Sequence, residues 1–292
     1  MRLSQRIAAL PAFIGTSPGD VLNAAAPHRG LAVTRDVAFG PRPDQRLDIY
    51  RPLHAADLPM IVFFYGGGWH GGSRGRYGFV AASFAGAGAV VLVPDYRLYP
   101  AIRFPDFLRD CAEAAAWAQP RQRALGAGAG FYLMGHSAGA YNAVMLGLDP
   151  SWLGEAGGDP AGIDGVIGLA GPYDFVPSRN PSIAASFPDD GPATQPVSFV
   201  RHDAPPLLLM HGTADRTVKP RNSLALAARQ ADAGGTAELV LYPRLGHVGI
   251  VTSLLPLLAW RAPVRRDAIA FIRASHRSPP VPSPAPLPAA PA

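Results

Sequence analysis

The stretch FYLMGHSAGAYN, residues 131–142, places a serine between two glycines directly after a short apolar run. Gly135, Ser137 and Gly139 satisfy the pattern G-x-S-x-G. In that pattern the serine lies on a tight, strained turn from a strand into a helix, where bulky neighbours would clash. An Ala-rich segment follows the motif, as such a helix requires. The stretch therefore predicts a nucleophile at the end of a buried strand, and an ordinary small-residue turn is the alternative.

Short apolar runs like the one before Ser137 recur along the chain and alternate with helical Ala/Leu patterns. The predicted strands are 34–40, 46–52, 60–66, 89–95, 131–135, 164–171, 206–212 and 237–243. The predicted helices are 76–87, 106–119, 138–147, 220–233 and 264–275. The first two strands alternate polar and apolar residues, as an antiparallel edge ribbon does, whereas the later ones are continuously apolar, as buried parallel strands are. This order predicts an α/β protein with an eight-stranded, mostly parallel sheet and helices on both faces.

The chain of 292 residues is long enough for one large core. We expect a single α/β domain over residues 33–276, preceded by a helical lead-in over 1–32. A Pro-rich tail over 277–292 is predicted to be disordered. The segment 173–205 is long, Pro-rich and weakly periodic, and it is predicted to be a lid-like insertion over the sheet.

Composition argues against several classes of protein. The net charge is +5, but the basic residues are scattered, Lys219 is the only lysine, and no basic run with interleaved aromatics occurs. We therefore expect no nucleic-acid partner. Cys111 is the only cysteine, which rules out an intramolecular disulfide and a cysteine-based metal site. We expect Cys111 to be a buried residue of the core.

The first residues, MRLSQRIAALPAFIG, contain early arginines and a short apolar segment that Pro11 interrupts. A surface helix is favoured over a secretory leader, so a cytoplasmic location is predicted. No stretch approaches the roughly 20 apolar residues of a membrane span, and no integral membrane segment is expected. The sequence carries no signal of an oligomeric state.

A serine nucleophile needs a general base, and the base needs an acid that orients it. On a strand-to-helix elbow the chain order is serine, then an acid, then histidine. Asp215 follows the seventh predicted strand and His247 follows the eighth, in that order. A helix cap is the alternative for Asp215 and a surface loop residue for His247. Asp174, after the sixth strand, is the competing acid. We predict that Ser137, Asp215 and His247 are catalytic.

A third element of this chemistry is a set of backbone amides that bind the developing oxyanion. The sequence YGGGW, residues 65–69, is a glycine-rich turn after the third predicted strand, where backbone can approach a ligand closely. The predicted donors are the amides of Gly67, Gly68 and Ala138, and one such donor contributes about 3 kcal/mol to transition-state stabilisation. The phosphate-binding patterns G-x-x-x-x-G-K-[S/T] and G-x-G-x-x-G at a helix start are absent.

These motifs resemble those of α/β-hydrolases of the esterase/lipase branch, close to hormone-sensitive-lipase-like and kynurenine-formamidase-like enzymes. The resemblance covers roughly residues 45–275 and rests on YGGGWHGGS, VPDYRLYP, GHSAGAYNA, HGTADRTV and GHVG. The family has HGGGW where this chain has Tyr65. His136 resembles the residue found on the formamidase and feruloyl-esterase-like side. The turn PDYRL, residues 94–98, is expected to anchor the glycine loop, with Asp95 as its hydrogen-bonding residue.

The resemblance implies a serine hydrolase that cleaves carboxylic esters with short to medium acyl chains and needs no metal or organic cofactor. The expected partner is a small-molecule ester, with Trp69, Tyr141 and Tyr173 as substrate-binding side chains. Hydrolysis of an aryl-formamide or a peptide amide is the nearest alternative. A non-catalytic binding protein on this scaffold is the alternative from another class, but such a protein would be expected to have lost a catalytic residue or the glycines.

Overall fold

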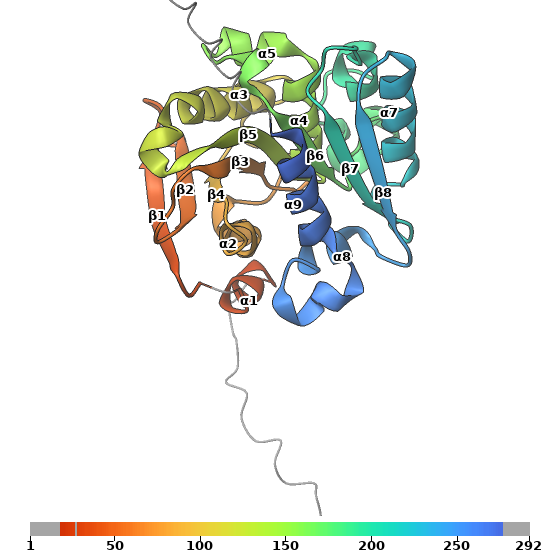
Figure 1. Cartoon of the computed structure of the whole chain (residues 1–292). Coiled ribbons are helices and arrows are strands. Elements are labelled where there is room, and N and C mark those ends of the chain that lie inside the picture. The colour runs from red at the N-terminus through yellow and green to blue at the C-terminus, as the bar shows by residue number, and fades with distance from the viewer. Residues whose placement is uncertain (1–17, 27, 277–292) are drawn as a thin grey trace, which may run out of the picture.

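A single eight-stranded sheet runs through the computed structural model, which describes residues 18–26 and 28–276 (Figure 1). The strands are β1 (Leu31–Ala38), β2 (Arg46–Pro52), β3 (Leu58–Phe64), β4 (Val90–Pro94), β5 (Ala127–His136), β6 (Gly165–Leu169), β7 (Leu207–Gly212) and β8 (Ala237–Tyr242). Their order in the sheet is β1-β2-β4-β3-β5-β6-β7-β8. The predicted tail, 277–292, and residues 1–17 of the predicted lead-in lie outside the described residues.

Nine α-helices occur in the described ranges 18–26 and 28–276. They are α1 (Pro18–Ala24), α2 (Gly78–Ala85), α3 (Asp106–Ala118), α4 (Ala138–Leu148), α5 (Pro150–Glu155), α6 (Pro181–Ala184), α7 (Arg221–Asp232), α8 (His247–Thr252) and α9 (Val264–Ser275). Short 3₁₀ helices join them: η1 (Arg74–Tyr77), η2 (Gln119–Arg121), η3 (Arg123–Leu125), η4 (Pro160–Gly162), η5 (Pro177–Arg179), η6 (Pro192–Thr194), η7 (Pro196–Ser198) and η8 (Pro256–Arg261). The five predicted helices correspond to α2, α3, α4, α7 and α9.

Strand direction follows the hydrophobic pattern of each strand. β1 and β2 form an antiparallel ribbon that pairs antiparallel with β4, and all other pairs are parallel. β1 begins three residues before its predicted start, because Leu31 pairs with Pro52 across the ribbon. A register irregularity between Thr34 and Val37 interrupts the alternation from which the strand was predicted. The mostly parallel eight-stranded sheet is otherwise as predicted.

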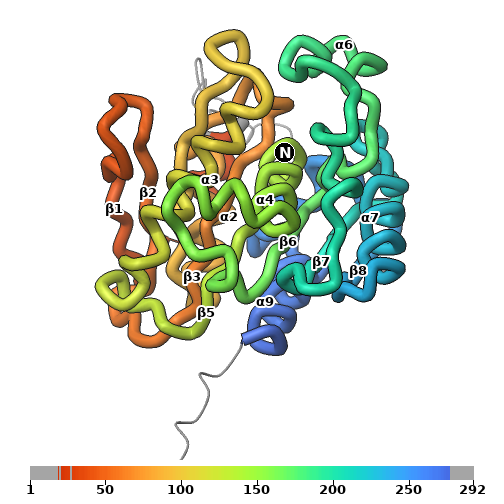
Figure 2. The backbone as a smooth tube through the Cα atoms, turned by 90° about the horizontal axis from the view of Figure 1, so that it is seen from above, coloured from red at the N-terminus to blue at the C-terminus, as the bar shows by residue number. Residues whose placement is uncertain are grey.

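Helices cover both faces of the sheet. α2 packs on β2 and β4 and α9 on β6 and β7, whereas α3 and α4 lie on the opposite face, where α4 contacts β5 and β6. Figure 2 shows the strands side by side from β1 at one edge to β8 and α7 at the other. This division follows from the right-handedness of connections between parallel strands. A connection that leads toward one edge of the sheet places its helix on one face, and a connection that leads toward the other edge places its helix on the opposite face.

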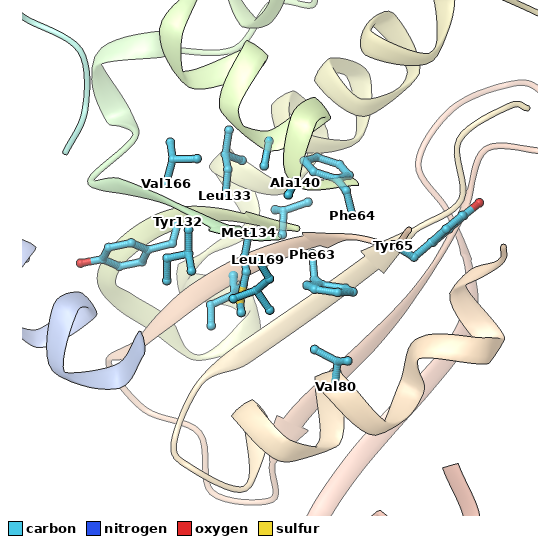
Figure 3. Packing of buried hydrophobic residues seen from close by; sticks show 14 of the residues in the cluster. Phe63, Phe64, Tyr65, Val80, Tyr132, Leu133, Met134, Ala140, Val166 and Leu169 are labelled. Atoms are coloured by element: carbon cyan, nitrogen blue, oxygen red, sulfur yellow. The ribbon is translucent and has the colours of Figure 1, made fainter. Parts of the chain in front are cut away.

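The core is apolar on both faces of the central strands. In β3, Phe63 points toward Val80 of α2, while Phe64 points toward Ala140 of α4 (Figure 3). Successive side chains of a strand point to opposite faces, so β3 must be apolar throughout. Cys111 of α3 is fully buried, as predicted, and burial raises the pKa of its thiol well above the ordinary value.

The loop after β4 fixes the glycine loop after β3. Asp95 accepts a hydrogen bond from the backbone amide of Arg74 (2.8 Å) and pairs with the Arg74 guanidinium. The amide of Tyr99 donates to the carbonyl of Trp69 (2.8 Å). The turn that contains Asp95 therefore anchors the glycine loop, as the sequence predicted.

Asp110 of α3 anchors the loop after β4 from the core side. Its carboxylate is buried and accepts hydrogen bonds from the backbone amide of Arg97 (2.9 Å), from Arg97 Nε (2.8 Å) and from Arg42 Nη2 (2.7 Å). Removing this carboxylate would leave a buried backbone donor and two guanidinium groups without their acceptor.

We expect Asp110→Ala to lower the free energy of unfolding by about 2–3 kcal/mol, because buried donors lose their partner. The matched control is Asp106→Ala in the same helix. Asp106 pairs with Arg109 at the surface, and its removal should cost less than about 1 kcal/mol. Urea denaturation of both variants measures the difference. Equal losses for the two variants would contradict an anchoring role for Asp110.

Candidate active site

Ser137 occupies the turn between β5 and α4 with a strained backbone, φ 56° and ψ −120°. Its amide donates to the carbonyl of Leu169 in β6 (2.9 Å), which holds the turn against the sheet. A Cβ on Gly139 would overlap the carbonyl oxygen of Phe64, and a Cβ on Gly135 would overlap the carbonyl of Gly139. The two glycines of the motif therefore allow the close packing that the turn needs.

Three side chains from three loops form one hydrogen-bonded chain. His247 Nε2 lies 2.9 Å from Ser137 Oγ, and His247 Nδ1 lies 2.7 Å from Asp215 Oδ2. The other oxygen of Asp215 accepts hydrogen bonds from the amides of Thr217 and Val218, both at 2.9 Å. A carboxylate on Nδ1 requires the proton there, which leaves Nε2 free to accept the proton of the serine hydroxyl.

The environment of Asp215 keeps its carboxylate ionised. Burial alone raises the pKa of Asp215, but hydrogen bonds with His211 and His247 outweigh this effect and hold the pKa well below its usual range. His211 Nε2 lies 3.3 Å from Asp215 Oδ2, and its other ring nitrogen lies 2.7 Å from Ser223 Oγ. His211 ends β7 and was not predicted as part of this site. Its position four residues before Asp215, inside the same motif, is the available sequence signal.

The structure brings Asp215, and not Asp174, to His247. Asp174 is exposed, and its backbone amide donates to Asn222 Oδ1 (2.9 Å). Over residues 28–276 its carboxylate forms no hydrogen bond or ion pair with His247. The prediction of Asp215 rested on the order of the loops along the chain. It agrees with the structure, in which the carboxylate of Asp215 lies next to His247.

The glycine loop places backbone amides beside Ser137. Gly67 and Gly68 both have positive φ, 143° and 61°, and a Cβ on Gly67 would overlap the carbonyl of Gly71. The amides of Gly67, Gly68 and Ala138 have no acceptor within the part of the chain that the structure describes. All three residues line the same cavity as Ser137, so their donors are available to a bound oxyanion.

Tyr65 supports the glycine loop where the family pattern has histidine. Its ring stacks on Tyr96 with 4.5 Å between the ring centroids. The hydroxyl of Tyr96 donates to the carbonyl of Tyr65 (2.7 Å). Both rings are buried. The aromatic stack and the hydrogen bond to the Tyr65 carbonyl therefore add to the contacts of Asp95 and Tyr99 that hold the loop, and none of these contacts needs the family histidine.

His136 lies directly behind His247, with 4.9 Å between the ring centroids. Its Nε2 lies 3.2 Å from the carbonyl of His247, and its Nδ1 lies 3.2 Å from the hydroxyl of Tyr77. Burial, aided by the charge of His247, lowers the pKa of His136 to about 3. His136 is therefore neutral near pH 7, and as a neutral imidazole it can donate to the His247 carbonyl and accept from Tyr77.

A cavity of about 550 Å³ opens above Ser137. Of the predicted substrate-binding residues, Trp69 lines it, but Tyr141 and Tyr173 do not. Both tyrosines are fully buried. The Tyr141 hydroxyl donates to the carbonyl of Thr194 (2.8 Å), and the Tyr173 ring packs on Gly171 and Gly168. Their assignment to the cavity wall is therefore corrected: both belong to the core beneath it.

Other side chains form the wall in their place. The apolar members are Phe175, Val176, Ile183, Val218 and Val248, and the polar ones include His70, Arg179, Asn180, Ser182, Thr217, Lys219, Arg221 and Asn222. Val218 and Val248 were missed although they stand three residues after Asp215 and one after His247. Proximity in sequence to the catalytic candidates is the signal that could have identified them.

The segment 173–205 forms η5, α6, η6 and η7 beside this cavity. It stands at the same end of the sheet as the loop between β4 and α3 (Figure 2). The amide of Phe104 in that loop donates to the carbonyl of Ser186 (2.8 Å). The role of this segment as a lid stays a prediction.

The comparisons with known proteins agree with this fold. Residues 47–229 match the BD-FAE family model, which is more than half of the chain. Esterase LipC of Mycobacterium tuberculosis is 29% identical over 244 residues, 75% of this chain and 60% of LipC. Kynurenine formamidase of Danio rerio is 30% identical over 153 residues, 51% of this chain and 50% of that protein.

Among solved structures, a truncated carbohydrate esterase from gut microbiota superposes with a TM-score of 0.73 and 18% identity, over 86% of this chain and 99% of that one. The predicted α/β-hydrolase fold is thereby confirmed. The chain spans only about half to three fifths of the length of the curated relatives it matches.

Within residues 18–26 and 28–276, no group of three or more His, Cys, Asp or Glu side chains is arranged to hold a metal ion. None of the helices described there combines the length and apolarity needed to cross a bilayer. The cytoplasmic location stays a prediction from the sequence.

The low pKa of Asp215 predicts a pH dependence of stability. A carboxyl whose pKa is lower in the folded state stabilises the fold above its unfolded pKa of about 3.9. That contribution is lost as the pH falls through the folded pKa. We therefore expect the free energy of unfolding to fall less steeply below about pH 4 in Asp215→Asn than in the wild type.

Chemical denaturation at a series of pH values measures this slope. Asp232→Asn, at the exposed end of α7, is the control for loss of a surface carboxylate. If the free energy of unfolding falls equally steeply below about pH 4 in Asp215→Asn and in the wild type, Asp215 does not contribute in this way.

Proposed function

Since the chain belongs to the BD-FAE family, we propose that it is a serine hydrolase that cleaves carboxylic esters through an acyl-enzyme. The observation that carries this proposal is the hydrogen-bonded chain from Ser137 through His247 to Asp215. Ser137 and His247 line the same cavity as Gly67 and Gly68, whose amides are the proposed oxyanion donors. Nucleophile, base, orienting acid and oxyanion donors are the parts that acyl transfer requires.

In the proposed reaction, Ser137 Oγ attacks the acyl carbonyl while His247 Nε2 takes the hydroxyl proton. The carbonyl oxygen becomes negatively charged and accepts hydrogen bonds from the amides of Gly67, Gly68 and Ala138. His247 then gives the proton to the leaving alcohol, and the C–O bond to the alcohol breaks.

Water completes the proposed cycle. His247 removes a proton from the water as it attacks the acyl-enzyme, and it returns that proton to Ser137 when the acid leaves. Asp215 keeps the imidazole oriented and stabilises its protonated form. His136 stays neutral behind it near pH 7.

Hydrolysis of an aryl-formamide is the second candidate, because the same groups would attack a formyl carbonyl. The similarity to the kynurenine formamidase of Danio rerio favours including it. It differs from ester cleavage in the leaving group, since an amine must be protonated by His247 as it departs.

We expect Ser137→Ala to lower turnover of 4-nitrophenyl acetate by about a thousandfold or more, because the nucleophile is lost. A fluorophosphonate probe should label the wild type at Ser137 alone, as peptide mapping by mass spectrometry would show. Asp174→Asn is the control, since its exposed carboxylate forms no hydrogen bond with Ser137, Asp215 or His247. Full turnover by the alanine variant, or labelling elsewhere, would refute the proposal.

The cavity of about 550 Å³ predicts a preference for short to medium acyl chains. A cavity of this volume accommodates a small molecule, and the insertion beside it contains only short helices. A series of 4-nitrophenyl esters should give the highest kcat/KM between about C2 and C6, with N-formylkynurenine and a peptide amide assayed alongside. Highest activity on long-chain emulsified triglycerides would contradict this preference, and faster turnover of N-formylkynurenine would favour the second candidate.

A further inference from the structure

The outer wall of the cavity is positively charged. Arg179, Lys219 and Arg221 line the cavity and are exposed to solvent. No aspartate or glutamate belongs to the described lining. The less exposed lining residues include the apolar side chains of Trp69, Phe175 and Val218. An apolar interior with cations at the opening suits a ligand that is uncharged at one end and anionic at the other.

The three cations belong to one continuous wall. Arg179 ends η5, in the segment after β6, whereas Lys219 and Arg221 stand at the start of α7. Asn222 joins the two segments: its side-chain oxygen accepts the amide hydrogen of Asp174 (2.9 Å), and its side-chain nitrogen donates to the carbonyl of Lys219 (3.0 Å). The positions of the two cationic segments are therefore fixed relative to each other.

Within the described residues, these three cations, Arg179, Lys219 and Arg221, form no ion pair. Asp190 feels the charge of Arg179, but it accepts hydrogen bonds from Ser178 and lies off the cavity wall.

The amino end of α7 carries a basic residue, which is unusual for a helix. The amino end of a helix carries partial positive charge, so acidic residues are favoured in the first turn and basic ones are not. The first turn of α7 contains no acidic residue and begins with Arg221. The helix of 12 residues thus adds its own positive end to the charge of the wall. An anionic ligand would be attracted by both.

We propose that the substrate is an ester with a carboxylate a few bonds from the ester group, and that the wall formed by Arg179, Lys219 and Arg221 binds this carboxylate. The inference rests on the proposed ester hydrolysis. The carboxylate takes no part in bond making or breaking, since water adds only to the ester carbonyl. The wall selects the substrate, and the reaction at Ser137 is unchanged.

Matched ester pairs test this proposal. For a charge on the acyl side, the pair is mono-4-nitrophenyl adipate and 4-nitrophenyl 6-oxoheptanoate, in which a methyl ketone replaces the carboxylate. For a charge on the alcohol side, the pair is 4-acetoxybenzoate and 4-acetoxyacetophenone. The leaving groups of the second pair differ in reactivity, so its ratio is compared between wild type and variants only.

The variants are Arg221→Gln and Arg179→Gln, and Arg229→Gln is the matched control. Arg229 is exposed on the same helix, eight residues or about 12 Å further along, and its loss changes the net charge equally. For at least one pair we expect the ratio of kcat/KM, anionic over neutral, to fall about two- to fivefold in Arg221→Gln, and Arg179→Gln should lower the same ratio. In Arg229→Gln the ratio should equal that of the wild type.

For the adipate pair in the wild type, we expect the ratio to be about five to ten at low salt if the charge lies on the acyl side. The ratio that responds to the variants should decrease between about 0.01 M and 1 M salt, as the Debye length falls from about 30 Å to about 3 Å. Ratios that neither salt nor the two variants change, with the neutral esters still hydrolysed, would overturn the cationic wall and leave the proposed function standing. Failure to hydrolyse any of the four esters would overturn the proposed function, and the inference with it.

Discussion

The close approach of α4 to β3 is the constraint on which the candidate site depends. Gly139 leaves no room for a Cβ against the carbonyl oxygens of Phe64 and Tyr65. Ser137 directly precedes α4, and Gly67 follows β3 by three residues. The contact between the two backbones therefore helps to set the distance between Ser137 and the proposed oxyanion donors. The strained φ of Ser137 is compatible with the fold because the surrounding sheet holds the turn from both sides.

Electrostatics then separates the roles of three neighbouring histidines. His247 is partly exposed and lies between Ser137 and Asp215. His211 is buried on the far side of the carboxylate and helps to keep it ionised. His136 is buried behind His247 and is neutral. The three rings lie close together, yet their surroundings leave the ring of His247 as the one in contact with the serine.

Much of this could be predicted from sequence because the decisive signals are local. The apolar runs indicated the strands, and the motif around Ser137 fixed which strand carries the nucleophile. The order of loops was enough to prefer Asp215. The wall of the cavity could not be predicted in the same way, because it is formed by tertiary contacts. Tyr141 lies one helical turn after Ser137, but its hydroxyl is directed to Thr194 and away from the cavity. β1 was displaced because an irregularity breaks its alternation.

Tyr65 stands where the family has histidine, so this position of the glycine loop holds a side chain that does not titrate near neutral pH. Burial raises the pKa of Tyr65 far above its ordinary value, so the phenol stays protonated near neutral pH. A histidine at this place would exchange a proton with solvent near neutrality, and the donors of the glycine loop could shift with it. Here the ring that packs against Tyr96 at the start of the glycine loop keeps one protonation state near neutral pH. A change of reaction rate with pH in that range then does not arise from titration at this position.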